Sequence, residues 1–339
     1  LKQNSWLKRI QKGRAAAVSE DFNPMATVKL ANGVEMPIVG FGTAFFGDVR
    51  LPEQAWKGVH TALEVGYRHL DTARMYGNER QVGDVLGHYF MTGKLTREDV
   101  FITTKVGHPP HPCYPDCKTQ YMYKEELNAY DEVMREFQEC LTALGVGYVD
   151  LLLLHWPGVT PWNTPVKDEE RPSPELAQKK REQMWRAAED IYSQKLARAI
   201  GVSNYTQRHL EALVPICRTK PMMNQIEIHP YCAQEEMVKY CEREGVRLTA
   251  YSPLASGKAN LMEDPLLVDL AAKKGVSPGK LVLCWLAQRG IVVIPKSSNP
   301  GRMLDNLTLK VDLLTSEEVD AITALDKGMH TCPDPAEIP

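Results

Sequence analysis

The sequence predicts an α/β protein, a single (β/α)8 TIM barrel with an N-terminal β-hairpin and long loops at its carboxyl-terminal face. The main observation is that eight short apolar segments alternate with helix-like segments between residues 38 and 295, a pattern typical of a closed parallel barrel. The second is the length, since 339 residues that are 43% hydrophobic suffice for one barrel of about 250 residues and its loops. We divide the chain into a leader, residues 1–24, and the barrel, residues 25–339.

The leader differs in charge from the rest of the chain. Its cations precede the first acidic residue, Glu20; they are Lys2, Lys8, Arg9, Lys12 and Arg14. A natural presequence for import into an organelle, an artificial leader and a disordered tail can all have this composition. We therefore leave residues 1–24 out of the fold reasoning.

The overall charge argues against two classes of partner. The chain has 40 Lys and Arg against 43 Asp and Glu, a net charge of -3, which gives no general attraction for nucleic acid or an anionic membrane. No apolar run approaches the roughly 18 residues of a membrane-spanning helix. Eight cysteines without a secretory signal indicate a reducing compartment. We expect a cytoplasmic protein that acts on a small molecule.

A hairpin is expected at the start of the barrel. Apolar residues alternate on both sides of the pair Asn32-Gly33, which favours a tight turn between two antiparallel strands. The alternating residues are Val28, Leu30, Val34 and Met36.

The barrel strands are predicted from short apolar runs, and the helices from amphipathic spacing after a Pro or acidic start. The eight strands are Ile38–Gly42, Tyr67–Asp71, Val100–Val106, Val149–His155, Arg198–Val202, Met222–Glu227, Arg247–Tyr251 and Ile291–Pro295. Clear helices between them are Pro52–Val65, Glu126–Leu144 and Glu235–Glu244.

Two other nucleotide-binding folds do not match. A Rossmann fingerprint needs a third glycine after Gly40-Phe41-Gly42, and Thr43-Ala44 with two Phe follows instead. A P-loop needs a glycine-rich loop that ends in Gly-Lys-Ser or Gly-Lys-Thr, and the chain has none.

Four titratable side chains are expected at one mouth, because the active groups of such barrels lie at the carboxyl ends of the strands. They are Asp71 and Lys105 at the ends of the second and third strands, Tyr76 in the loop after the second, and His155 at the end of the fourth. Each of these residues could instead have a purely structural role, such as a helix cap for Asp71. Because they lie at the ends of successive strands, however, together they indicate a catalytic site more strongly than any one of them does alone.

The chemistry of the set is that of proton donation to a carbonyl. A phenol with a pKa near 10 is a poor acid unless a cation stabilises its phenolate, and Lys105 can supply that cation. A buried ammonium needs a counter-charge, which Asp71 provides. His155 can then orient a carbonyl oxygen while Tyr76 donates the proton.

Seven motifs in order resemble the aldo-keto reductases over residues 27–326. They are GYRHLDTARMYGNE (66–79), ITTKV (102–106), LLLLHWP (151–157), GVSNY (201–205), NQIEIHP (224–230), YSPL (251–254) and IPKS (294–297). The resemblance implies a barrel that binds NADPH without a metal. It also implies that Asp71, Tyr76, Lys105 and His155 hold the four catalytic positions, with Tyr76 as proton donor.

The resemblance also implies a set of cofactor-binding residues. Ser203, Asn204 and Gln225 would hold the nicotinamide carboxamide, and Tyr251 would stack on the ring. Ser252 and Leu254 would line the pyrophosphate groove, Lys296, Ser297 and Arg302 would bind the 2′-phosphate region, and Asp305 and Asn306 would meet the adenine. Gly42, Thr43 and Asp71 complete the set. Two cations near a helix that begins around Pro300 agree with an anion site, which favours NADPH over NADH.

The substrate side departs from the family. Many relatives have a Trp after the glycine pair, where this chain has Thr43-Ala44-Phe45-Phe46, and the loop Gly107–Tyr123 is longer than expected. A long loop at the mouth favours a gate or lid over a simple surface insertion, whereas a long carboxyl-terminal substrate loop is expected to be missing or short. Phe45, Phe46, Trp156 and the Gly107–Tyr123 loop are the expected substrate contacts.

The Gly107–Tyr123 loop also holds possible ligands and thiols. His108, His111, Cys113 and Cys117 match no common zinc spacing, so we expect no metal. Cys113 and Cys117 form either a redox-sensitive pair or two ordinary thiols, and the second reading is favoured.

The sequence therefore predicts NADPH-dependent reduction of an aldehyde or ketone to the alcohol. The alternative is an NADPH-binding redox sensor or interaction module on the same fold, because a fold does not fix a function. The expected partner is a small-molecule carbonyl substrate and the expected state is a monomer, while the identity of the substrate and the physiological direction stay open.

Overall fold

The computed structural model describes residues 26–44, 52–109, 120–159 and 167–339. The leader lies outside these ranges, as do Phe45 and Phe46. His111, Cys113 and Cys117 also lie outside them, so the expected substrate contacts of the two Phe and the possible thiol pair stay predictions.

The predicted hairpin is present. Strand β1 (Thr27–Lys29) pairs antiparallel with β2 (Glu35–Pro37), with Val28 opposite Met36. Gly33 has a φ of +89°, a conformation that glycine adopts without a Cβ penalty. Its N–H donates to the carbonyl oxygen of Leu30 over 2.9 Å and tightens the turn.

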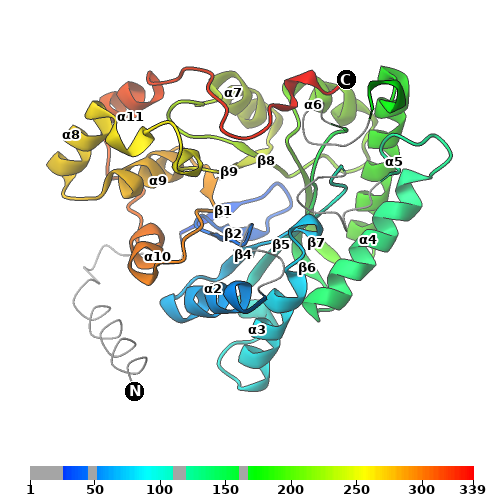
Figure 1. Ribbon diagram of the computed structural model, residues 1–339, viewed down its shortest axis with the longest axis horizontal. Helices are drawn as coiled ribbons and strands as arrows, with labels where there is room; N and C mark the ends of the chain where they lie inside the picture. Colours follow the sequence, from blue (N-terminus) through cyan, green and yellow to red (C-terminus); the bar gives the residue numbers. More distant parts are fainter. Residues whose placement is uncertain (1–25, 45–51, 110–119, 160–166) are drawn as a thin grey trace.

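The eight remaining strands are all parallel and follow one another in chain order around the barrel (Figure 1). They are β3 (Phe41–Gly42), β4 (His69–Asp71), β5 (Phe101–Val106), β6 (Val149–Leu154), β7 (Ala197–Ser203), β8 (Met223–Glu227), β9 (Arg247–Tyr251) and β10 (Val292–Val293). The predicted fold class is confirmed.

The residues just before β3 meet the last strand, β10, and close the barrel along a seam. Val39 forms a parallel bridge with Val293, and the N–H of Val293 donates to the carbonyl oxygen of Ile38 over 2.9 Å. Both strands here are shorter than the predicted Ile38–Gly42 and Ile291–Pro295. Pro295 has no N–H to donate, so fewer backbone hydrogen bonds join the strands near it.

Ten α-helices alternate with the strands or follow them within the described ranges. They are α2 (Pro52–Val65), α3 (Glu79–Met91), α4 (Ala129–Leu144), α5 (Pro174–Ser193), α6 (Gln207–Leu213), α7 (Glu235–Glu244), α8 (Pro265–Lys274), α9 (Pro278–Gln288), α10 (Pro300–Leu307) and α11 (Ser316–Thr323). The predicted bounds of α2 and α7 are confirmed. Helix α4 begins three residues later than predicted, because the side chain of Asn128 caps it by accepting from the N–H of Tyr130.

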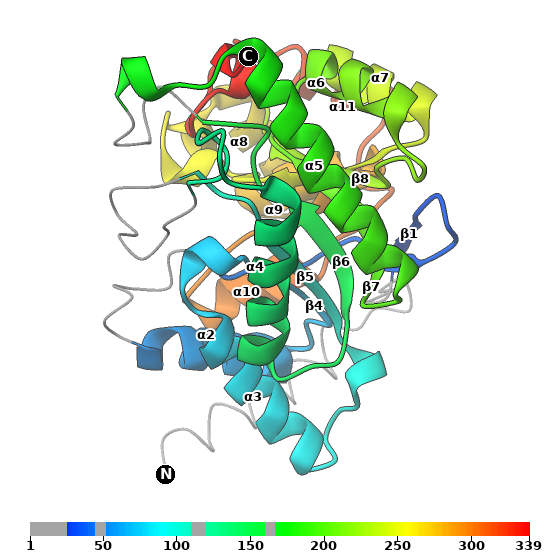
Figure 2. The ribbon, with the colours of Figure 1, turned by 90° about the vertical axis from the view of Figure 1, so that its right-hand side faces the viewer.

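The helices form the outer layer of the barrel. Figure 2 shows α4 and α5 side by side over the outer face of β5, β6 and β7. Strands β5 and β6 are buried along their whole length, as expected for parallel strands covered on both faces. None of the helices in the described part of the chain has the length and apolar composition needed to cross a membrane.

After α11, the segment Leu325–Pro339 crosses the carboxyl-terminal face of the barrel. In Figure 1 it runs in red from α11 to the end of the chain beside α6. Ile338 is fully buried, and its carbonyl oxygen lies 3.0 Å from Nε2 of His209 on α6. We call this carboxyl-terminal segment the tail. It reaches the mouth, which the sequence did not indicate.

Candidate active site

Asp71, Lys105 and Tyr76 meet at the mouth of the barrel. Asp71 ends β4, Lys105 lies on β5, and Tyr76 ends the short 3-10 helix η1 (Arg74–Tyr76). The ammonium of Lys105 donates to Asp71 Oδ1 over 2.6 Å and to the Tyr76 hydroxyl over 3.2 Å. It also donates to the carbonyl oxygen of Thr72 over 2.9 Å. The lysine side chain is fully buried, so the pair with Asp71 is shielded from water.

The electrostatics keep a proton on Tyr76 at neutral pH. Burial raises the pKa of the Tyr76 hydroxyl, and this outweighs the opposite effect of Lys105. Burial alone would lower the pKa of Lys105, but Asp71 and Tyr76 raise it above its usual value. The result is a neutral phenol beside a permanent cation, the arrangement needed for a proton donor whose conjugate base must be stabilised.

His155 follows β6 and faces the same mouth. Its ring lies edge-on to that of Tyr76, with 5.8 Å between centroids. Burial, followed by the nearby His108 and Lys105, lowers the pKa of His155 well below its usual value. The imidazole is therefore neutral at neutral pH. Its buried Nδ1 has no hydrogen-bond partner among the described residues.

His108 lies at the mouth, where the sequence predicts it only as part of the Gly107–Tyr123 loop and, by itself, as a possible metal ligand. Its ring lies 4.7 Å from that of His155 and 6.1 Å from that of Trp156, edge-on to both. His108 and Trp156 are each only 5% exposed. The position of His108 three residues after Lys105, beyond the end of β5, was the signal that could have placed it at the mouth. Trp156, a predicted substrate contact, lies beside His108.

The residues expected around the nicotinamide also lie together. The Ser203 hydroxyl donates to the carbonyl oxygen of Gln225 and the Tyr251 hydroxyl to Asn204 Oδ1, each over 2.8 Å. Gln225 Nε2 donates to Asp71 Oδ2 over 2.8 Å, which joins this group to the lysine pair. Asn204 has a φ of 62°, so the chain turns sharply after β7.

Lys296, Ser297 and Arg302 surround the start of α10. The Arg302 N–H donates to the capping side chain of Asn299 over 3.0 Å, and Arg302 Nε donates to Ser297 Oγ over 3.4 Å. Burial lowers the pKa of the Lys296 ammonium. Two cationic side chains at a helix N-terminus make an environment suited to a phosphate.

The other predicted cofactor residues border these two groups. The Thr43 N–H and hydroxyl donate to the carbonyl oxygen of Asp71 over 2.9 Å and 3.1 Å. A Cβ on Gly42 would lie 2.8 Å from the carbonyl oxygen of Ile294, so the backbone is closely packed there. Ser252 and Leu254 open the segment Ser252–Asn260, which follows β9.

Asp305 and Asn306, predicted near the adenine, lie on α10. Asp305 accepts a hydrogen bond from Ser277 over 2.7 Å and pairs with Lys280 at 3.5 Å, both at the start of α9. Asn306 is only 7% exposed. The carboxylate of Asp305 is thus already engaged by α9.

One buried carboxylate, Glu136 on α4, binds residues at both ends of the Gly107–Tyr123 loop. Glu136 Oε2 accepts from the Gly107 N–H over 2.9 Å and from the Tyr121 hydroxyl over 3.0 Å. Its other oxygen lies 3.6 Å from Nη1 of Arg74, the first residue of η1. Glu136 thereby ties the turn that carries Tyr76 to the start and end of the loop. Sequence reasoning missed this residue.

The barrel fold and the residues at its mouth are those of one protein family. The chain is a member of the aldo/keto reductase family, whose model matches residues 38–327.

Named relatives cover most of the chain. Aldose reductase B of Dictyostelium discoideum is 34% identical over 317 residues, which are 91% of this chain and 95% of the relative. Glyoxal reductase of Bacillus subtilis is 36% identical over 312 residues, which are 92% and 97%. Among solved structures, an aldo-keto reductase of Bombyx mori in complex with NADP has a TM-score of 0.76 and 32% identity, and the match covers 91% of this chain and 95% of that one.

Proposed function

We propose that this chain catalyses the NADPH-dependent reduction of an aldehyde or ketone to the alcohol, with Tyr76 as the proton donor. The observation that carries the proposal is the contact of the buried Lys105 ammonium with both Asp71 and Tyr76. Family membership supports it, as do the reductase names of the relatives and the NADP in the Bombyx mori structure.

The proton moves from the Tyr76 hydroxyl to the carbonyl oxygen of the substrate. Lys105 stabilises the phenolate that remains, and Asp71 keeps the ammonium charged by balancing it in a buried site. The neutral imidazole of His155 donates a hydrogen bond to the same carbonyl oxygen and fixes its position. An imidazolium there would oppose the neighbouring ammonium, so the lowered pKa of His155 suits this role.

The residues fit NADPH by their chemistry. Ser203, Asn204 and Gln225 offer donors and acceptors for a carboxamide, and Tyr251 offers a ring face. Lys296 and Arg302 offer cations for a 2′-phosphate, the group that distinguishes NADPH from NADH. When bound, the cofactor supplies the hydride to the carbonyl carbon. Because Gln225 also holds Asp71, the amide group that binds the nicotinamide is connected to the residues that move the proton.

The substrate is proposed to be a small carbonyl compound that binds beside the adjoining rings of His108 and Trp156. The relatives carry names with different substrates, aldose and glyoxal among them. An aromatic and an imidazole wall suit a compound with both an apolar and a polar part. Phe45 and Phe46 remain predicted contacts of the same pocket.

The deciding experiment follows NADPH oxidation with a panel of aliphatic, aromatic and sugar carbonyl compounds, with NADH in parallel. We expect turnover that prefers NADPH. Tyr76→Phe should retain NADPH binding and lose at least about a hundredfold of kcat, the usual share of general acid catalysis. Unimpaired turnover in Tyr76→Phe would falsify the assignment. NADPH binding without turnover on any compound would instead support the sensor alternative.

A further inference from the structure

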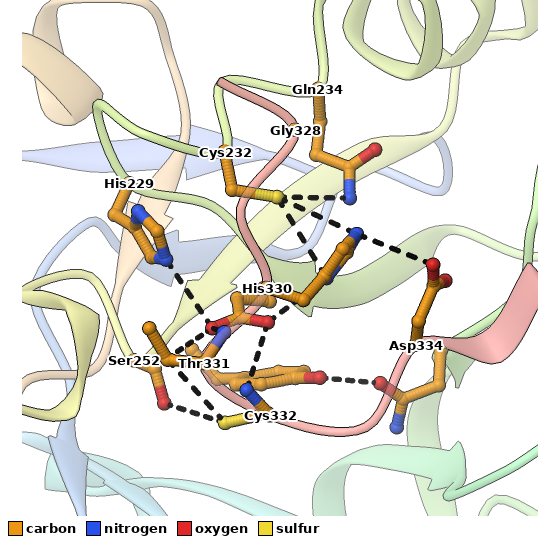
Figure 3. Close-up of polar contacts among 12 residues, drawn as sticks. His229, Cys232, Gln234, Ser252, Gly328, His330, Thr331, Cys332 and Asp334 are labelled. Carbon is orange, nitrogen blue, oxygen red and sulfur yellow. Dashed lines mark hydrogen bonds and ion pairs between the residues drawn. The ribbon is translucent and has the colours of Figure 1, made fainter. Parts of the chain in front are cut away.

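Glu227 is a buried carboxylate at the carboxyl end of β8 that the proposed chemistry does not use. It accepts hydrogen bonds from three consecutive residues of the tail (Figure 3). The donors are His330 Nδ1 at 3.0 Å, the Thr331 N–H at 2.9 Å and the Cys332 N–H at 3.3 Å, and the Thr331 hydroxyl donates as well.

These bonds hold the Glu227 charge in place. Glu227 is only 2% exposed, and an unpaired charge so deeply buried is strongly unfavourable. Burial would raise the pKa of Glu227, but hydrogen bonds from His229, His330 and Thr331 lower it well below its usual range. The carboxylate is therefore ionised, and most of its donors belong to the tail.

His330 is the charged partner in the tail. Hydrogen bonds to Cys232 and Glu227 raise the pKa of His330 to about 10. Its ring also lies 3.9 Å from the carboxylate of Asp334, and Figure 3 shows it between Cys232 and Asp334. At neutral pH the contact with Glu227 is therefore an ion pair between a partly exposed imidazolium and a buried carboxylate.

The fastened part of the tail touches the segment that follows β9. Cys332 Sγ lies 3.3 Å from Ser252 Oγ, and the Lys258 ammonium donates to the carbonyl oxygen of Thr331 over 3.0 Å. In this segment five non-glycine residues have positive φ; they are Ser252, Ala255, Ser256, Ala259 and Asn260. Such a conformation costs energy for each of these residues. Contacts with other parts of the chain, the tail among them, therefore help to stabilise the conformation of this segment.

We propose that Glu227 is a positioning residue that fastens the tail, through His330, Thr331 and Cys332, against the segment Ser252–Asn260, so that tail and segment close over the cofactor as one unit. The part about the cofactor rests on the proposed function, whereas the fastening does not. Because coupling between two sites is reciprocal, a bound cofactor should hold the tail more firmly on the barrel, and the fastened tail should increase the affinity for the cofactor.

Limited trypsin digestion of the full chain tests the fastening. Cleavage after Lys327 releases the peptide 328–339, which mass spectrometry identifies. The N–H groups of Lys327 and Met329 both donate to the carbonyl oxygen of Tyr231 and hold the backbone on either side of the cleaved bond. Loosening of the tail should therefore speed cleavage. We expect Glu227→Gln to release the peptide about tenfold faster than the unaltered chain, as for the loss of a charged hydrogen bond. The matched control is Glu236→Gln, a carboxylate of α7 that pairs with Lys239 on the surface, and it should match the unaltered chain.

Thr331→Val is the second variant, because it removes one hydroxyl donor and leaves the buried carboxylate intact. It should release the peptide about threefold faster than the unaltered chain, which keeps the test open if Glu227→Gln does not fold. Equal release rates in Thr331→Val, Glu236→Gln and the unaltered chain would overturn the fastening.

NADPH tests the coupling to the cofactor. It should slow release of the peptide from the unaltered chain, and its Kd, measured by fluorescence, should rise about tenfold in Glu227→Gln. Faster release with an unchanged Kd would overturn the coupling. If the unaltered chain binds no NADPH, the proposed function fails, while the release rates still decide the fastening.

Discussion

The ring of His108 lies edge-on to the ring of His155, with 4.7 Å between their centroids. After burial, His108 is the largest cause of the lowered pKa of His155. The second imidazole thus helps to keep the first one neutral.

Replacing His108 should therefore change the pH dependence of the reaction. In His108→Phe the pKa of His155 should rise, because the electrostatic effect of His108, which lowers that pKa, is removed. If neutral His155 is the active form, kcat/KM falls as the pH drops through this pKa, so the acid limb moves to higher pH. A pH-rate profile checks this, with His88→Phe on the exposed surface of α3 as the control. An acid limb at the same pH as in the unaltered chain would contradict the role of His108.

Asp71→Asn should destabilise the protein as well as slow it. The substitution leaves the Lys105 ammonium buried without its counter-charge, which costs about 3–5 kcal/mol of unfolding free energy. Asp269→Asn is the control, since Asp269 pairs with Lys273 on the surface and should cost less than about 1 kcal/mol. Urea unfolding measures both. Adding Lys105→Met to Asp71→Asn should restore much of the stability without restoring turnover, and failure to do so would argue against a charge effect.

Lys296→Met tests the 2′-phosphate site. Loss of a charge-assisted contact should raise the Kd for NADPH by roughly 10- to 100-fold. The Kd for NADH, which has no 2′-phosphate, should stay the same. Titration of intrinsic fluorescence with both cofactors gives the comparison, and a parallel loss for both would place Lys296 elsewhere on the cofactor.

Glu136 and Glu139 offer a matched pair on α4, because both contact Arg74. Glu136→Gln weakens the bonds at both ends of the Gly107–Tyr123 loop and should cost about 1–3 kcal/mol. It should also raise KM for the carbonyl substrate more than it lowers kcat. Glu139 is half exposed, so Glu139→Gln should cost less than about 1 kcal/mol and leave KM unchanged. Similar kinetics in the two variants would show that the contact with Arg74, and not the bonds to Gly107 and Tyr121, accounts for the effect on KM.

Two glycines of α3 should respond in opposite directions to alanine. A Cβ on Gly83 would lie 2.5 Å from the carbonyl oxygen of Ala143, whereas a Cβ on Gly87 would meet nothing within 4 Å. Gly83→Ala should therefore destabilise the barrel. Gly87→Ala should stabilise it by about 0.5–1 kcal/mol, the helix preference of alanine over glycine. Thermal unfolding of the two variants checks the signs.

The strands and the four mouth residues were predictable because short apolar runs define parallel strands, and each strand end fixes where its last side chain lies. Asp71, Lys105 and His155 needed only that geometry. Most of the expected cofactor residues needed the resemblance to the family. Gln225 carries no local signal of its own, and Lys296 is marked only as a cation near a helix that begins around Pro300.

The contacts of Glu227 and Glu136 could not be predicted in this way. Glu227 bonds to His330, 103 residues later, and nothing in the intervening sequence indicates that the tail returns to β8. Glu136 reaches Gly107 and Arg74 only after α4 has packed on the barrel. Glu136 lies on a helix among other acidic residues, where an exposed charge is the usual expectation.

The Val39–Val293 seam joins the two ends of the barrel sequence. A ribosome makes β3 first and β10 last, so one side of β3 stays without its strand partner until nearly the whole barrel has left the exit tunnel. The barrel is therefore expected to close only when translation is almost complete, and the shortness of β3, two residues, limits the strand edge that stays open until then.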